Sequence, residues 1–436
     1  MRRHLAILAL AAALVIAGCI SPPATTDDIG VENGYRYDAD IAVTTGDGLN
    51  ESEREAVVGR AMARVEYIRG HEFQETVDVR VISRAEYRNR TNDASDAANL
   101  TARQRWNEQV WEALHIIGEG ETYPEARATN RGSSVVGYYS PGDGEIVLVS
   151  DSATPRVARG TLVHELVHAL QDQHLSLGET RQLQDEQLAV WSLIEGDANY
   201  VQDRYERLCG VTWECIETPR AAPVRSGSFN QGLFLVSYLP YAEGPEFVEA
   251  LRERGDWRAV DDGYGRFPAS TEQVIHPDRY PGDEPATVPI PDRSNSGWEQ
   301  FDDLDRPGHD TVGEGSIYAM FAATGVIDRS GAAQYDYDHP LSSGWAGDRI
   351  VPYHNGSGGY GYVWRVRWAT PGEARAFAEG YRTLLDRRGA DRIGDGRYRI
   401  GDGGFADAFR ISRDGQTVTI VNAPTAPGLD AVHAPS

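Results

Sequence analysis

Lysine is absent from the sequence, so all 42 basic residues are arginine, against 66 aspartate and glutamate residues. The formal net charge of −24 argues against nucleic-acid binding, because such proteins neutralise phosphates with clustered basic side chains. A very acidic chain without lysine is typical of proteins that work in concentrated salt, where a screening length of about 3 Å at 1 M removes most self-repulsion. A GC-rich gene alone would explain the arginine but not the acidic surplus.

Long apolar runs are scarce, and the one at the N-terminus spans only Leu5 to Ala17 after two arginines. It is too short for a comfortable transmembrane helix and is typical of an export signal. Residues 16–19, Ile-Ala-Gly-Cys, match a lipobox, which predicts a signal peptide over residues 1–19 and lipidation of Cys19. We therefore expect a lipid anchor on the outer face of the cell membrane. An ordinary cleaved signal peptide and an uncleaved anchor are the alternatives.

Cysteine is also rare, with three in the chain. Once Cys19 carries the lipid, Cys209 and Cys215 remain as a pair in CGVTWEC, and this spacing in an exported protein predicts a short local disulfide. Two reduced buried thiols are the alternative, and two sulfurs are too few for a typical metal site. Asn-x-Ser/Thr triplets mark candidate glycosylation sites at Asn50, Asn89, Asn99 and Asn355.

Hydrophobic periodicity predicts an α+β protein that follows a Pro-, Thr- and Gly-rich segment over residues 20–50, which we interpret as a flexible tether. Alternation predicts a strand over residues 77–83, and a Pro-Gly-Asp-Gly turn predicts a hairpin over residues 135–150. The tail over residues 424–436 is predicted to be disordered. The expected helices and C-terminal strands are 51–70, 102–117, 155–175, 184–208, 244–255, 313–323, 371–387, 362–368 and 417–421.

The strongest chemical signal is the segment TLVHELVHALQDQH over residues 161–174. Residues four apart on a helix differ by about 40° around its axis, so His164 and His168 face the same way. Two imidazoles on one face can bind one Zn²⁺, and Glu165 lies where it can act on a water molecule. Flanking leucines and valines predict burial, and buried histidines need partners. An amphipathic surface helix with coincidental histidines is the alternative.

A catalytic zinc site needs a third protein ligand, and two residues compete for this role. His174 has the spacing of the last histidine in HExxHxxGxxH, but Gln171 occupies the glycine position and favours a continuous helix. On such a helix His174 would point about 120° away from His168. Glu195 follows an apolar run on the next predicted helix, where a carboxylate needs a cation as partner. We predict Glu195 as the third ligand, with a surface acid as the alternative.

Further residues are candidates for supporting roles around this site. Asn199 lies one turn beyond the predicted third ligand and could hydrogen-bond a ligand side chain, while Asp197 is expected to orient a neighbouring group. His276, in STEQVIHPDRY, is predicted to stabilise an oxyanion during catalysis, with a purely structural loop histidine as the alternative. Tyr241 and Tyr264 are further candidates for this donor.

With these residues in place, the sequence resembles the gluzincin metallopeptidases, whose signature is HExxH plus a glutamate from a following helix. The resemblance implies that His164, His168 and Glu195 bind Zn²⁺ and that Glu165 is the general base and proton shuttle. A wider resemblance, from residue 164 to about residue 370, is to a group of exported HExxH proteins common in haloarchaea and some bacteria. The matching segments are HELVHALQDQH, LIEGDA, GDWRAVDDGYGRFPASTEQVIHP, GWAGDR and VWRVRWAT.

The resemblance also implies a fold. We expect a zincin-like core with a small mixed sheet, the HExxH helix and the glutamate helix, followed by a C-terminal α/β extension. We place the zincin-like domain at residues 51–295 and a C-terminal α+β region that covers the cleft at residues 296–423. Zincins commonly pair an extended peptide with an edge strand, and the strand over residues 145–150 is the candidate, with an ordinary structural hairpin as the alternative.

Together these features predict a zinc-dependent peptidase that is lipid-anchored outside a halophilic cell. Its partners would be a peptide or protein substrate and the membrane, with no nucleic acid. The alternative is a surface binding lipoprotein that keeps the zinc fold without turnover, and hydrolysis of a different substrate class also stays open. The presence of Glu165 favours the enzyme, because a binding protein has no need of a general base.

Overall fold

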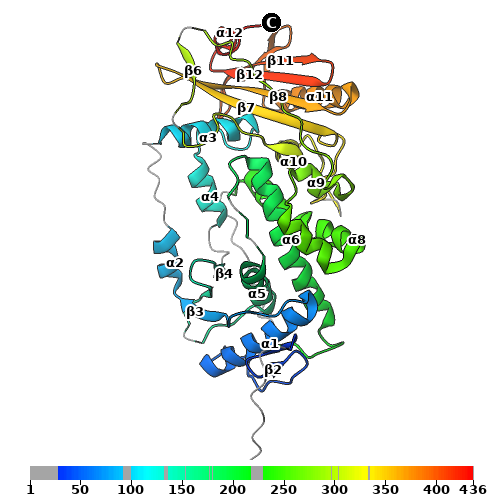
Figure 1. Cartoon of the computed structure of the whole chain (residues 1–436). Coiled ribbons are helices and arrows are strands. Elements are labelled where there is room, and N and C mark those ends of the chain that lie inside the picture. The colour runs from blue at the N-terminus through cyan, green and yellow to red at the C-terminus, as the bar shows by residue number, and fades with distance from the viewer. Residues whose placement is uncertain are drawn as a thin grey trace, which may run out of the picture.

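The chain is an α+β protein whose layers follow one another along a long axis (Figure 1). They run from α1 (Glu51–Arg69) at one end through α6 (Gln184–Leu208) to β11 (Ala408–Asp414) and β12 (Thr417–Ala423) at the other. None of the helices in the described part of the chain combines the length and apolar character needed to cross a membrane. The predicted signal peptide with Cys19, and the predicted site Asn99, lie outside the described residues. The computed structural model describes residues 28–91, 100–131, 136–152, 154–175, 177–178, 180–217, 229–295, 297–302, 304–331 and 334–435.

The N-terminal end of the molecule is a three-stranded sheet with helices packed beside it. The element bounds are α1 Glu51–Arg69, β3 Asp78–Ile82, α2 Arg84–Thr91, β4 Gly137–Ser140, β5 Glu145–Val149 and α5 Arg159–His174. The strand order is β3-β5-β4, with β3 parallel and β4 antiparallel to β5, so the sheet is mixed as expected. Met62 and Val65 of α1 and Leu166 of α5 are fully buried in the core of this end.

The segment before α1 is folded, so the expected flexible tether over residues 20–50 is wrong for its described part. β1 (Val31–Glu32) and β2 (Tyr35–Arg36) form a small antiparallel hairpin that contacts α1. The carboxylate of Glu66, on α1, is buried and accepts the N–H of Gly30 at 2.8 Å. Because a buried carboxylate needs such donors, it holds the segment in place. Local composition carried no sign of this long-range partner.

The middle of the molecule is a layer of helices. Their bounds are α3 Ala102–Ala113, α4 Tyr123–Arg131, α6 Gln184–Leu208, α7 Gln231–Ala242, α8 Gly244–Gly265, α9 Thr271–Ile275, η2 Pro277–Arg279 and α10 Gly313–Ala323. The boundaries of α6 and α10 are those predicted. α8 is kinked at Gly255 and Asp256, where the sequence predicts a helix end. α3 stops short of its predicted end because His115 has a positive φ of 52°.

The C-terminal end is an antiparallel sheet in the order β6-β7-β8-β12-β11-β10-β9. The bounds are β6 Trp298–Gln300, β7 Trp345–Asn355, β8 Tyr360–Trp368, α11 Pro371–Arg387, β9 Asp391–Gly394, β10 Arg397–Arg399, β11 Ala408–Asp414, β12 Thr417–Ala423 and α12 Gly428–Val432. Leu429 and Val432 of α12 are fully buried against the sheet. The expectation of a disordered tail over residues 424–436 is therefore wrong, because two apolar residues one turn apart anchor it.

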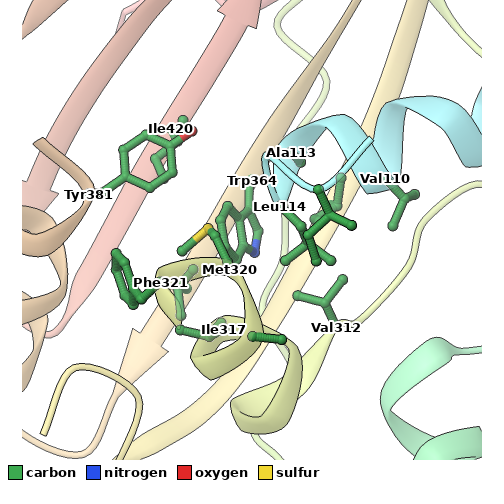
Figure 2. Packing of buried hydrophobic residues seen from close by; sticks show 14 of the residues in the cluster. Val110, Ala113, Leu114, Val312, Ile317, Met320, Phe321, Trp364, Tyr381 and Ile420 are labelled. Carbon is green, nitrogen blue, oxygen red and sulfur yellow. The ribbon is translucent and has the colours of Figure 1, made fainter. Parts of the chain in front are cut away.

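One hydrophobic core joins the helices to the C-terminal sheet. Figure 2 shows Val110 of α3, Leu114 just after it and Ile317 of α10 gathered around Trp364 of β8. All four side chains are fully buried. The predicted domain boundary at residues 295 and 296 therefore does not separate two cores, although the sheet itself begins close to it.

The segment GWAGDR has a structural explanation. Asp348 on β7 is buried and accepts the N–H groups of Val312 and Gly313, each at 3.0 Å, at the start of α10. The indole of Trp345 donates to the same carboxylate at 3.0 Å. The carboxylate satisfies backbone donors that a helix N-terminus leaves unpaired, and it fixes α10 to the sheet.

A buried histidine lies where α3 meets the C-terminal sheet. His115 is 1% exposed, its ring packs against Tyr381, Phe405 and Phe409, and its Nε2 lies 3.0 Å from the Tyr381 hydroxyl. Burial, and then the charge of Arg388, lower the pKa of His115 to about 3. An unfolded histidine has a pKa of about 6.5, so between these values the unfolded chain binds a proton that the folded chain does not.

We expect acid to destabilise the protein through this group. As the pH falls below about 6.5, His115 lowers the free energy of unfolding by up to about 1.4 kcal/mol per pH unit. The variant His115→Phe keeps an aromatic ring but cannot titrate, so its stability should fall less between pH 7 and pH 5. Denaturant unfolding in concentrated salt at both pH values measures the difference. An equal loss of stability in wild type and variant would contradict the assignment.

Candidate metal centre

The helices α5 and α6 bring the three predicted ligands together. Glu195 Oε2 lies 3.1 Å from His164 Nε2 and 3.5 Å from His168 Nε2, and the two nitrogens are 3.0 Å apart. Ligand atoms bound at about 2.0–2.1 Å around a tetrahedral ion are about 3.3 Å from one another. The spacing of the three atoms therefore fits three corners of a tetrahedral zinc site.

The glycine after Glu195 has a packing role. A Cβ atom placed on Gly196 would lie 2.4 Å from the carbonyl carbon of Gly244, where α8 begins. Because no real Cβ comes so close to backbone, a larger residue at position 196 would push the two helices apart. In the sequence Glu-Gly-Asp, Glu195 thus faces α5, and the neighbouring Gly196 permits the close contact with the start of α8.

The charges of the three side chains suit a cation. Burial would lower the pKa of His168, but the Glu195 carboxylate outweighs it and raises this pKa to about 9. Burial opposes ionisation of Glu195, yet the charges and hydrogen bonds of His168 and His164 hold its pKa below the usual value. Two imidazole nitrogens at this separation need either a proton or a metal ion between them. A divalent cation would replace that proton.

Gln171 orients one of the ligands. Its Oε1 accepts a hydrogen bond from His168 Nδ1 at 2.8 Å, which leaves His168 Nε2 to face the cluster. Its Nε2 donates to the carbonyl of Ile194 at 3.0 Å and to Asp197 Oδ2 at 3.3 Å. From the sequence alone, Gln171 served only as a reason for the helix to continue past His168. Its role was missed, although a buried amide three residues after a ligand histidine is a signal that could have suggested it.

Asp197 supports the position of Gln171 through buried hydrogen bonds. It is fully buried and accepts hydrogen bonds from Arg69 Nε at 3.0 Å and from the Tyr264 hydroxyl at 2.9 Å. Arg69 also donates to Asp261 at 2.6 Å. The orienting role expected for Asp197 thus has a structural basis through Gln171. Tyr264 belongs to this network and is not placed as an oxyanion donor.

Glu165 lies beside an edge strand. Its Oε2 accepts the backbone N–H of Tyr139, on β4, at 2.8 Å. The strand predicted to be the edge, over residues 145–150, is the central strand β5, so that prediction is wrong. A hairpin signal does not say which of its two strands pairs with a third one. In the described sheet the third strand, β3, pairs with β5 and leaves β4 at the edge.

Tyr241 of α7 forms another wall of the centre. Its ring stacks on the ring of His164 with centroids 6.2 Å apart, and its hydroxyl lies close to the Glu195 carboxylate. Burial, and then the charges of Glu195 and Glu165, raise the pKa of Tyr241. The hydroxyl therefore stays protonated at neutral pH and is available as a hydrogen-bond donor.

Within the described segments, three residues considered from the sequence make no hydrogen bond to the predicted ligands. The His276 Nε2 is 3.0 Å from Glu314 Oε1, in a separate cluster with Asp338, so the structure does not bring His276 to the predicted zinc ligands. No side-chain hydrogen bond joins Asn199 to another residue in the described segments, which contradicts its expected link to a ligand. His174 contacts the carbonyl of Glu72 and lies outside the ligand cluster, in line with the continuous helix.

Two cavities lie beside Tyr241, which lines both of them. One, of about 780 Å³, is reached by Glu195 and is walled by aromatic side chains that include Trp111, Trp191 and Phe234. The other, of about 890 Å³, is acidic, and its carboxylates are those of Asp203, Glu243, Glu246, Glu249, Asp336 and Asp338. The C-terminal region reaches the cavities through loops before and after α10, so the seven-stranded sheet does not itself cover the cleft.

The remaining predicted residues have local roles. Cys209 and Cys215 form a disulfide just beyond the end of α6. Asn50 caps α1 by accepting the N–H of Glu53. Asn355 accepts N–H groups in the turn between β7 and β8, and Asn89 lies exposed on α2. Glycosylation at these asparagines stays a prediction.

We expect zinc binding to depend on the acid ligand and not on the third histidine of the segment. Glu195→Ala removes one of three ligands, so the variant should lose stoichiometric zinc. His174→Ala, on the same α5 helix but outside the cluster, should retain it. Metal analysis after dialysis in concentrated salt measures both. Zinc loss in His174→Ala with retention in Glu195→Ala would overturn the ligand assignment.

Gln171→Leu should weaken zinc binding by about 10–100-fold, because residues that orient metal ligands typically contribute this much. Competition against a chromophoric chelator measures the affinity, and circular dichroism checks the fold. Gln173→Leu, on the same helix but away from the cluster, is the matched control. Unchanged affinity in Gln171→Leu would show that His168 needs no such orientation.

Comparison with known proteins addresses the C-terminal part of the chain. A family model described as Domain of unknown function (DUF8575) matches residues 299–433. No curated protein and no solved structure matches the chain. The matched segment contains strands β7 to β12, whereas His164, His168 and Glu195 all lie before it.

Proposed function

We propose that the protein is a zinc-dependent peptidase with a zincin-like core, held outside the cell by a lipid on Cys19. The observation that carries the proposal is the convergence of His164, His168 and Glu195, with all ligand atoms within 4.8 Å of one another, beside Glu165. Two imidazoles and one carboxylate from neighbouring helices are a donor set found in catalytic zinc sites, where a further position serves water or substrate. A mixed sheet next to these helices adds support.

In this proposal, different residues around the cluster carry out different steps of peptide hydrolysis. A Zn²⁺ ion held by the three ligands supplies Lewis-acid chemistry. Glu165 takes a proton from the attacking water and later delivers it to the leaving amine. Because the N–H of Tyr139 binds Oε2 of Glu165, the other carboxylate oxygen is the one left for this proton. The Tyr241 hydroxyl donates a hydrogen bond to the oxygen that becomes negative as the carbonyl is attacked.

The edge strand β4 supports a peptide as substrate. An edge strand presents unpaired backbone groups, and an extended peptide can add to it as a further strand. A peptide beside β4 passes Glu165, and we propose that its side chains enter the two cavities that Tyr241 lines. The cavity walled by Trp111, Trp191 and Phe234 suits an apolar side chain. The acidic cavity suits a basic one, so we propose substrates with an apolar residue near a basic residue at the cleavage point.

The decisive experiment compares metal content and cleavage in the full chain. Glu165→Gln keeps size and hydrogen bonding but cannot accept the proton. We expect this variant to retain zinc and to cleave peptides about 10²–10⁴ times more slowly than wild type. Casein and a mixed peptide library in multi-molar salt serve as substrates, and zinc is measured on the same samples. Glu55→Gln, an exposed acid on α1, is the matched control.

Stoichiometric zinc in a wild type that cleaves no peptide would reject the peptidase. It would favour the alternative, a binding lipoprotein that keeps the zinc fold without turnover. Cleavage that survives unchanged in Glu165→Gln would instead show that the activity does not use this general base.

A further inference from the structure

A second group of carboxylates lies far from HExxH, where α3 meets the C-terminal sheet. It consists of Glu112 at the end of α3, Glu119 in the loop that follows, and Asp407 just before β11. Carboxylate oxygens of the three residues lie within 4.8 Å of one another. Glu112 and Asp407 are 5% and 3% exposed, whereas Glu119 reaches the surface.

The two buried carboxylates are only half satisfied. Glu112 Oε2 accepts Gln109 Nε2 at 2.8 Å, and Asp407 Oδ2 accepts Asn422 Nδ2 at 2.9 Å. The other oxygen of each carboxylate, Glu112 Oε1 and Asp407 Oδ1, has no hydrogen-bond partner among the described residues. The amide oxygens of Gln109 and Asn422 are buried and without a partner as well. Because buried polar atoms are nearly always paired, four such oxygens on two contacting side-chain pairs point to a missing positive partner.

No arginine in the described segments forms an ion pair with these three carboxylates. Arg105 lines the adjacent cavity but packs over the ring of Tyr360. Burial raises the pKa of Glu112, Glu119 and Asp407, as expected for carboxyl groups that lack a compensating charge. A cation bound between them would supply that charge.

We propose that Glu112, Glu119 and Asp407 bind a calcium ion that fastens α3 to the C-terminal sheet. Ca²⁺ prefers oxygen ligands at about 2.4 Å, so two oxygens on one ion can be up to about 4.8 Å apart, which the cluster satisfies. The site has no imidazole or sulfur, which distinguishes it from the HExxH centre and disfavours zinc and related metals. Mg²⁺ needs a near-ideal octahedron, whereas Ca²⁺ accepts irregular sets of carboxylate, amide and water oxygens.

Backbone contacts keep the two loops of the proposed calcium site together. The Glu119 N–H donates to the carbonyl of Gly404 at 2.8 Å, which joins the loop after α3 to the loop that precedes Asp407. A Cβ on Gly118 would lie 2.2 Å from the Gly404 oxygen, so only glycine permits this approach. A cavity of about 280 Å³ lined by Glu112 and Glu119 leaves room for water ligands and for access from solvent.

A different arrangement would also relieve the charge, because Glu112 and Asp407 lie close enough to share one proton in a hydrogen bond. Such a pair needs no cation and leaves Glu119 without a role, which makes Glu119 the discriminating residue. It is exposed, so Glu119→Gln should not disturb the fold. Asp407→Asn keeps an oxygen that can accept the Asn422 amide. Asp402→Asn, an exposed acid in the same loop, is the control with the same change of charge.

The test is equilibrium dialysis of the full, zinc-loaded chain against radioactive Ca²⁺ in concentrated KCl. We expect wild type and Asp402→Asn to bind about one Ca²⁺ per chain and to melt at a higher temperature when it is present. Glu119→Gln and Asp407→Asn should each bind Ca²⁺ at least about tenfold more weakly, with zinc content unchanged. Binding at the HExxH centre is thereby separated from binding here.

Three results would overturn the proposal. One is wild type that retains no Ca²⁺ and shows no thermal shift, as a proton-sharing pair predicts. A second is equal Ca²⁺ affinity in all three variants, which would place the ion elsewhere. The third is displacement of Ca²⁺ by an equal concentration of Mg²⁺, which would reject the assignment of the ion.

Discussion

The buried chain of polar contacts from Arg69 through Asp197 and Gln171 to His168 is the constraint on which the centre depends. Arg69 and Asp197 are almost completely shielded from water, and a buried ion pair is tolerable only when its remaining donors and acceptors are satisfied. Tyr264 and the Gln171 amide meet part of that need. In doing so they lock α1, α5, α6 and α8 together, so the imidazole of His168 has one orientation.

The other parts of the centre follow from this arrangement. With α5 fixed, Glu165 meets the edge strand β4 on one side and Tyr241 of α7 closes another. Tyr241 lines both cavities, and further walls are supplied by α3, α4 and loops of the C-terminal region. Because the C-terminal sheet shares its core with α3 and α10, the position of those walls depends on packing that reaches far from the metal ligands.

Buried carboxylates serve three different purposes in this acidic chain. Asp197 is paired with an arginine, and Asp348 accepts the free N–H groups at the start of a helix. In Glu112 and in Asp407, one carboxylate oxygen has neither kind of partner among the described residues. The carboxylates of Asp197 and Asp348 thus find their partners within the protein, and hydrogen bonds to a charged group of this kind stabilise the fold. The Glu112 and Asp407 carboxylates form the type of site that a bound cation completes.

Features that depend on local spacing could be predicted from the sequence alone: the α+β class, the bounds of α6 and α10, the Cys209–Cys215 pair, and the placement of His164 and His168 on one helix face. Glu195 could be chosen because an acid in an apolar run needs a partner. The contacts of Gln171 and Tyr241, the edge position of β4 and the separate location of His276 became visible only in the folded chain. These depend on contacts between segments far apart in the chain, and no local periodicity encodes which segments meet.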